Sequence, residues 1–138
     1  MTVIVRDNGF HPDDLFGAPL TAFDELEPGT KVLDLPNDAA AEALADHLAT
    51  LQVIRISFPS FADGRGFSLA KRLRNLGFAG RLRAAGHVIS DQYGKARRAG
   101  FDEVEISDDL AMRQPQHHWL QRANWDDTTY QDRLRAAH

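Results

Sequence analysis

The sequence contains no cysteine among its 138 residues. This absence excludes disulfide bonds, thiolate nucleophiles, iron–sulfur ligation and cysteine-based zinc sites as chemistry that the chain performs alone. Long apolar runs are also missing, because no stretch approaches the ~20 residues that a transmembrane helix needs. The first residues lack the basic segment and apolar run of a secretory signal. We therefore expect a cytoplasmic protein without a membrane partner.

An excess of positive charge is missing as well, since the formal net charge is -4 at pH 7. A nucleic-acid-binding domain usually carries a basic face, so nucleic acid is not expected as a partner. Arginines are nonetheless dense between Arg65 and Arg98, and such a local bias attracts small anions.

The hydrophobic pattern predicts one α/β domain over residues 1–138. Residues 54, 56 and 58 are β-branched or aromatic, residues 63–66 read Asp-Gly-Arg-Gly, and apolar residues then recur at helical spacing. This strand, loop and helix form the central unit of a series of alternating strands and helices, which predicts right-handed βαβ crossovers and a parallel sheet. Further strands are expected at residues 3–5, 30–35, 82–85 and 102–106, and further helices at residues 38–51, 88–99 and 119–134. The expected organisation is an N-terminal arm at 1–29, a βα core at 30–107 and a C-terminal helix or tail at 108–138.

One face of the predicted sheet is polar and of mixed charge. With a period of two, Asp34, Arg55, Arg83 and Glu105 lie opposite the apolar face. Strands of a sheet covered by helices on both faces are usually apolar throughout. The pattern therefore favours a curved, half-barrel-like sheet with its helices outside, whose inner face is covered by the N-terminal arm, the C-terminal tail or a second subunit. The alternative is an open, flavodoxin-like sheet with one partly solvated face.

The loop that follows the central strand is the first candidate site. Glycines let the backbone approach a bound group, an arginine offers a planar donor fork, and a hydroxyl near the helix start can assist. We expect Asp63, Gly64, Arg65, Gly66 and Ser68 to bind a small oxyanion or the anionic group of a cofactor. Asp-Gly is also a common turn pair, and Asp63 in that case only caps the helix.

The next strand-to-helix junction flanks this loop. Arg83 is expected to point into the same hollow as Arg65, with internal ion pairs as the alternative. His87 is a candidate catalytic acid or base because histidine titrates near neutral pH, although such a histidine is more often a solvated cap residue. Asp91 and Gln92 are expected to orient Arg83 or Arg65.

A metal site is not expected. His117 and His118 are adjacent in sequence, so their side chains diverge, and the nearby Asp126 and Asp127 do not complete a ligand set. A hard-cation site that combines the pair at residues 108–109 with Asp63 is a minor alternative.

Several motifs resemble a family of small bacterial proteins described as probable oxidoreductases involved in sulfite reduction. The shared stretches are residues 58–68 (FPSFADGRGFS), 82–86 (LRAAG), 91–92 (DQ) and 100–102 (GFD). The resemblance implies an association with assimilatory sulfate and sulfite reduction, and it suggests sulfite reductase as a partner. Members often carry a cysteine where this chain has Ala99, so a thiol-based redox role is not open to this chain. No dinucleotide fingerprint is present either, because Gly64 and Gly66 are not followed by the third glycine.

These observations lead to three hypotheses about function. The first is an accessory protein of sulfite reduction that binds a small oxyanion at residues 63–68 with Arg83 alongside. The second is an interaction module without a small ligand, which docks a partner such as sulfite reductase through the charged strand face and the tail from Trp119 onward. The third is a small enzyme with His87 as acid or base. The sequence assigns no cofactor, and a homodimer remains open.

Overall fold

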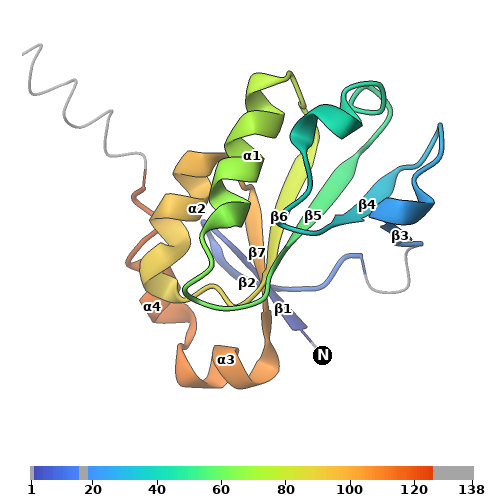
Figure 1. Ribbon diagram of the computed structural model, residues 1–138. Coiled ribbons are helices and arrows are strands. Elements are labelled where there is room, and N and C mark those ends of the chain that lie inside the picture. Colours follow the sequence, from blue (N-terminus) through green and yellow to red (C-terminus); the bar gives the residue numbers. More distant parts are fainter. Residues whose placement is uncertain (1, 16–18, 126–138) are drawn as a thin grey trace, which may run out of the picture.

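The structure, a computed structural model, describes residues 2–15 and 19–125 and is built on one seven-stranded sheet (Figure 1). The strand order is β2-β1-β7-β6-β5-β4-β3. The strands are β1 (Thr2–Arg6), β2 (Gly9–Pro12), β3 (Thr21–Ala22), β4 (Val32–Leu35), β5 (Val53–Phe58), β6 (Arg81–Gly86) and β7 (Glu103–Ser107). Strands β3 to β7 are parallel, whereas β1 pairs antiparallel with both β7 and β2. The predicted mixed α/β fold with a mainly parallel sheet is confirmed.

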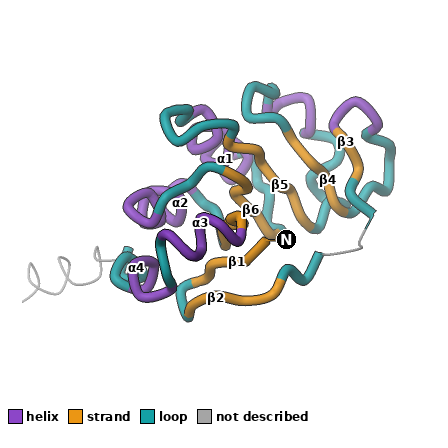
Figure 2. Tube along the Cα trace, turned by 90° about the horizontal axis from the view of Figure 1, so that it is seen from below, coloured by secondary structure: helices purple, strands orange, loops and turns teal. Residues whose placement is uncertain are grey.

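The parallel strands lie in the sheet in the order in which they follow one another in the chain. Successive right-handed crossovers that all step in one direction put their helices on one face. The helical segments are η1 (Phe23–Glu25), η2 (Ala41–Leu44), α1 (Arg65–Asn75), η3 (Ser90–Gln92), α2 (Tyr93–Ala99), α3 (Asp108–Arg113) and α4 (Gln116–Leu120). Helices α1 and α2 lie side by side on the same face of the sheet (Figure 2). Within the described ranges, no helix is long and apolar enough to cross a membrane.

Two predicted helices are shorter than expected. The helix expected at 38–51 is only the 3₁₀ helix η2 followed by turns. Its buried residues, Ala41 and Leu44, are three apart, and a 3₁₀ helix with three residues per turn brings such a pair to one side. The helix expected at 88–99 begins as η3 and becomes α-helical only at Tyr93.

Helices α1 and α2 both end at a glycine. Gly77 and Gly100 have φ values of +100° and +116°, a region that glycine enters without strain. The next residue folds back in each case: the N–H of Phe78 donates to Leu73 O, and the N–H of Phe101 donates to Ala96 O. Both phenylalanines are buried, and an apolar residue directly after the glycine commonly makes such a contact in a Schellman motif.

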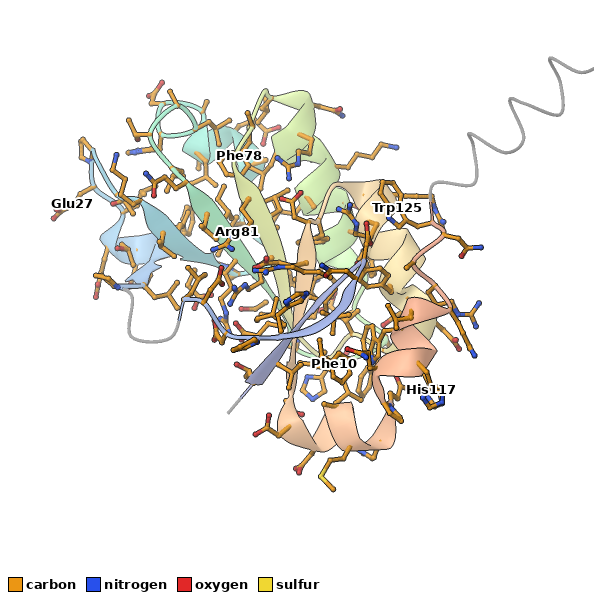
Figure 3. The ribbon with its side chains drawn as sticks, turned by 180° about the vertical axis from the view of Figure 1, so that it is seen from behind. Phe10, Glu27, Phe78, Arg81, His117 and Trp125 are labelled. Carbon is orange, nitrogen blue, oxygen red and sulfur yellow. The ribbon has the colours of Figure 1, made fainter. Side chains whose placement is uncertain are left out.

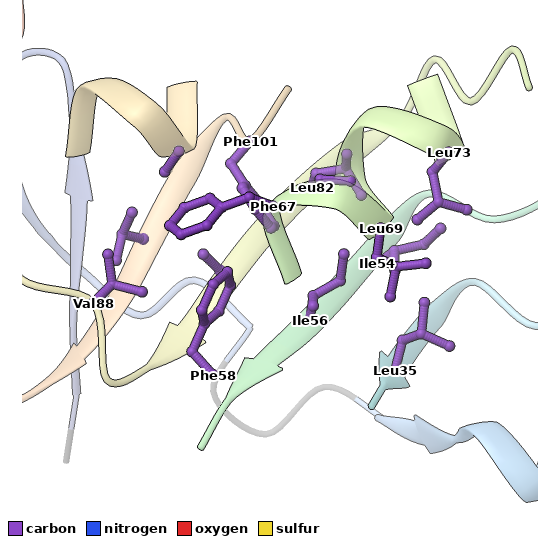
Figure 4. Packing of buried hydrophobic residues seen from close by; sticks show 14 of the residues in the cluster. Leu35, Ile54, Ile56, Phe58, Phe67, Leu69, Leu73, Leu82, Val88 and Phe101 are labelled. Atoms are coloured by element: carbon purple, nitrogen blue, oxygen red, sulfur yellow. The ribbon is translucent and has the colours of Figure 1, made fainter. Parts of the chain in front are cut away.

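The core lies between the sheet and the helix layer (Figure 4). Three aromatic rings meet there, with the Phe58 centroid 4.9 Å from Phe67 and 5.7 Å from Phe101. Gly66, in the first turn of α1, faces this cluster, and a Cβ at its position would lie 2.5 Å from Phe58 Cζ. A glycine is needed here because the helix packs directly on the ring that ends β5.

The opposite face of the sheet carries the predicted row of charges, and these pair with one another. Arg55 Nη1 donates to Asp34 at 2.9 Å, and Arg55 Nη2 donates to Glu105 at 2.6 Å. Past β2, residues 13–15, which we call the N-terminal strap, lead from one edge of the sheet toward β3 at the other (Figure 3). The strap carboxylates Asp13 and Asp14 accept hydrogen bonds from Arg83 at 2.8 and 2.7 Å. The N-terminal arm therefore covers part of the charged face. It was one of the three segments that the sequence analysis expected to cover that face.

The C-terminal segment is part of the fold over the described residues. Trp119 is 1% exposed, packs edge-on against Tyr93, and donates from Nε1 to Gln114 O. Trp125 donates from Nε1 to Asp7 in the β1–β2 turn. The helix predicted at 119–134 is wrong over residues 121–125, where turns follow the end of α4 at Leu120. Its remaining residues, with Asp126 and Asp127, lie outside the described part of the chain.

Candidate functional site

The loop after β5 carries a carboxylate and a guanidinium that bind each other. Arg65 donates from Nε and Nη2 to the two carboxylate oxygens of Asp63 at 3.0 and 2.9 Å, and its backbone N–H donates to Asp63 Oδ1 at 3.2 Å. The Arg65 guanidinium holds the pKa of Asp63 well below its usual range. The Asp63 carboxylate therefore binds the Arg65 guanidinium, which the sequence analysis had expected to bind an oxyanion ligand.

The neighbouring loop residues divide between packing and solvent. Gly66 is buried against Phe58, so its lack of a side chain serves helix packing. Gly64 has φ -90°, which any residue adopts, and its nearest contact for an added Cβ is 3.8 Å away. Ser68 is exposed on α1. None of these three positions has a geometry that only a ligand explains.

Arg83 does not reach this loop. It belongs to the charged face, whereas its neighbour Ala84 faces the helix layer, and its guanidinium is fully buried among carboxylates. Its donors contact Glu103, Asp13, Glu105 and Asp14 at 2.5 to 3.0 Å. Burial lowers the pKa of Arg83, but these carboxylates outweigh it and raise the pKa above its ordinary value. The expected hollow shared by Arg65 and Arg83 is therefore not formed, because the two side chains lie on opposite faces of the sheet.

A different hollow is present at the carboxyl ends of β6 and β7. Its volume is about 360 Å³. Its lining residues come from the loop after β5, the end of β6, the end of β7 and helix α3: Phe61, Gly86, His87, Ser107, Leu110 and Arg113. We call this the His87 pocket. Carboxyl ends of parallel strands are where α/β sheets and barrels commonly hold their ligands.

His87 is fixed in this pocket from two sides. Its Nδ1 lies 3.2 Å from Phe58 O, and its backbone N–H donates to the same oxygen at 3.0 Å. The Phe61 ring stands edge-on to the imidazole, with centroids 5.0 Å apart and an interplanar angle of 88°. A carbonyl oxygen accepts only, so the proton lies on Nδ1 and leaves Nε2 as the acceptor when the ring is neutral.

Gln92 holds the aromatic wall of the pocket. Its Nε2 donates to Phe61 O at 3.0 Å, and its Oε1 accepts the N–H of Ile89 at 3.0 Å. The predicted orienting role of Gln92 toward an arginine is replaced by this link between two strand-to-helix loops. Asp91 is exposed and pairs with Arg122 at 2.7 Å, so it points away from the pocket.

Helix α3 supplies the pocket residues that the sequence analysis missed. Ser107 caps it by accepting the N–H of Leu110 at 3.1 Å, and Arg113 lies in its last turn. Over residues 2–15 and 19–125, Arg113 forms no ion pair. A serine followed by two aspartates and an apolar residue is a helix-start signal at the end of a strand, and it could have identified α3.

Metal-binding clusters are not found in the described part of the chain. The rings of His117 and His118 have centroids 4.4 Å apart at an angle of 75°, and both residues lie on the short helix α4. Both carboxylate oxygens of Asp63 accept hydrogen bonds from Arg65. Asp63 therefore does not form the alternative hard-cation site with the acidic pair at the start of α3.

Comparison with known families identifies the chain. Residues 32–138 match the sequence profile of DUF934, bacterial proteins of unknown function. The chain belongs to this family. The matched DUF934 region begins at β4 and includes the loop after β5, the His87 pocket and α3, whereas β1, β2, β3 and the N-terminal strap precede it. Comparisons with curated proteins and with solved structures gave no match.

Proposed function

We propose that this DUF934 protein binds a small anionic ligand in the His87 pocket and acts as an accessory protein of sulfite and sulfate reduction. The observation that carries the proposal is the position of Arg113. It lines a partly open surface hollow together with His87, and within the described ranges it forms no ion pair with a carboxylate. A guanidinium offers a planar pair of donors to a sulfite, sulfate, phosphate or carboxylate group.

The remaining pocket groups suit the same ligand. His87 adds a second cationic group when it is protonated, and a neutral acceptor when it is not. The loop with Asp63 and Arg65 lies beside the pocket through its residue Phe61, so the predicted loop contributes a wall to the site. The assignment to sulfite reduction rests on the resemblance of residues 58–68 and 82–102 to proteins described in those terms.

Calorimetric titration with sodium sulfite tests the binding proposal. We expect saturable binding to the full chain that is lost in Arg113→Gln. Arg98→Gln is the matched control, since Arg98 is an exposed arginine on α2 away from the pocket. Equal binding by the wild-type protein and Arg113→Gln would overturn the proposed site. If binding is lost in Arg65→Gln instead, the loop itself holds the anion.

Growth of a deletion strain tests the pathway. We expect the strain to grow poorly on sulfate and to be rescued by sulfide, because sulfide is the product of the reductive branch. Equal growth on both sulfur sources would remove the link to sulfite reduction and leave the binding proposal to be judged by calorimetry.

A second candidate function is proton transfer by His87. The observation that favours it is the anchoring of Nδ1 by Phe58 O, which fixes the ring and leaves Nε2 toward other partners. On this proposal a bound anion whose protonation changes on binding would exchange its proton with Nε2. Calorimetry in two buffers of different ionisation enthalpy measures that proton, and His87→Asn should abolish the difference between the buffers.

The docking hypothesis stays a prediction, and two of its premises change. The charged strand face is paired internally, and Arg83 is covered by the N-terminal strap. Trp119 belongs to the buried cluster, so removal of the tail from that residue would disturb the fold as well as any interface.

A further inference from the structure

The size of the His87 pocket bears on which anion it holds, given the proposed function on which this inference rests. Its volume of about 360 Å³ lies in the ~300–1,000 Å³ range of small-molecule sites. At ~30 Å³ for each water, that is the space of roughly a dozen water molecules. An inorganic oxyanion beside Arg113 would leave most of the hollow unfilled.

The walls of the pocket are largely apolar. The ring of Phe61 and the side chain of Leu110, which is 6% exposed, form two of them. Gly86 contributes backbone to a third side of the pocket. It is a glycine because its φ is +112° and a Cβ there would lie 2.8 Å from Phe58 O. A flat apolar group fits against this backbone and the two apolar side chains.

The polar groups in the pocket are few. Ser107 accepts the N–H of Leu110 through Oγ as a helix cap, and its O–H remains a donor. The Ser107 hydroxyl, His87 and Arg113 are then the polar side-chain groups of the pocket. Apolar walls with a small number of placed polar groups are the usual composition of a site for an organic ligand.

We infer that the ligand class is an anionic group carried on a flat apolar body, such as an aromatic sulfonate, phosphate or carboxylate. The anionic group lies at Arg113, and the ring lies between Phe61, Leu110 and the backbone of Gly86. The exposed fraction of Phe61 is 41%, so part of its ring is open to such a contact.

A series of sulfonates tests this inference because its members share the charged group and differ only in the body. Sulfate, methanesulfonate and benzenesulfonate are titrated into the full chain by calorimetry. We expect benzenesulfonate to bind about tenfold tighter than methanesulfonate, the effect of burying one small ring partly against apolar walls. Phe61→Ala should remove that preference and leave methanesulfonate binding nearly unchanged. Leu20→Ala, at an exposed apolar residue outside the pocket, is the control.

The outcomes separate the inference from the proposed function. Equal affinity for the three anions, lost in Arg113→Gln, would overturn the ligand class and keep the anion site. Tighter binding of benzenesulfonate that neither Phe61→Ala nor Arg113→Gln alters would place the ligand elsewhere and overturn both. No binding of any member, with sulfite also inert, would remove the site and the inference together.

Discussion

Arg83 and Glu103 form an ion pair that solvent does not reach. Nε of Arg83 lies 2.5 Å from Glu103 Oε2, and the two side chains are 0% and 1% exposed. They are direct neighbours in the parallel register of β6 and β7. The pair is compensated from several directions, since Arg6 also contacts Glu103 at 3.1 Å and the strap carboxylates contact Arg83. Charges are tolerated at this depth because each has partners of opposite sign.

Removal of the Arg83 charge should destabilise the protein strongly. Arg83→Met keeps most of the side-chain volume but leaves Glu103 and Glu105 buried with fewer partners. We expect a loss of about 3–5 kcal/mol in the free energy of unfolding, measured by urea denaturation. Arg65→Gln, which breaks an exposed pair, should change it by less than about 1 kcal/mol. Similar values for the two variants would contradict the buried network.

The N-terminal strap should loosen in acid. Burial raises the pKa of Asp14, but the hydrogen bond from Arg81 and the charges of Arg81, Arg83 and Arg6 lower it to about 2. A carboxyl group whose folded pKa is depressed stabilises the fold above its unfolded pKa of ~3.9, and this contribution is lost as the pH falls. We expect the urea midpoint to decrease between pH 4 and pH 2.

Asp14→Asn should lower stability at pH 7 and flatten this acid dependence. Asp24→Asn, at an exposed acid on η1, is the control and should follow the wild-type curve. A wild-type slope in Asp14→Asn would mean that other carboxylates govern the acid transition.

Two glycines two positions apart, Gly64 and Gly66, should respond differently to the same substitution. Gly66→Ala places a Cβ against the buried Phe58 ring, and overpacking of this kind costs about 1–3 kcal/mol. Gly64→Ala meets no atom closer than 3.8 Å, and its backbone suits alanine, so stability should stay within about 1 kcal/mol of wild type. Thermal unfolding of both variants measures the difference. If Gly66→Ala is neutral, α1 does not pack on Phe58 as closely as described.

Gln92 should affect ligand binding without contacting the ligand. Gln92→Ala removes the hydrogen bonds to Phe61 O and from the Ile89 N–H, so the aromatic wall is no longer held to the next loop. We expect weaker binding of benzenesulfonate with methanesulfonate affected less, because only the former uses the Phe61 ring. Gln121→Ala, at an exposed glutamine outside the pocket, is the control. A uniform loss for both ligands would indicate general disruption of the site.

Local signals in the sequence predicted most of the fold. Strands β4 to β7 are encoded within a few residues each, and they appear where expected. The period of two also placed Arg55 on one strand face with Asp34 and Glu105, and Arg55 pairs with both of them.

The site was harder to predict because it depends on distant parts of the chain. Asp13 and Asp14 are separated from Arg83 by 70 and 69 positions in the sequence, and no local sequence pattern predicts that contact. Arg65 and Arg83 were expected to lie close together because both are near strand ends. Side chains alternate between the two faces of a strand, and Arg83 lies on the charged face, opposite the helix layer. His87 was identified from its place after a strand, whereas Arg113 belongs to a helix that had been missed.

The pairing of β1 with β7 has a consequence for how the protein is made. Thr2 lies opposite Ser107 in the sheet, so β1 must wait for β7, the last of the seven strands in chain order, before its inner neighbour exists. Until then β1 and β2 form a two-stranded ribbon, which is marginal in water by itself. The parallel strands can pair in the order in which they are synthesised, and the β1–β2 ribbon joins the sheet only after β7 has been made.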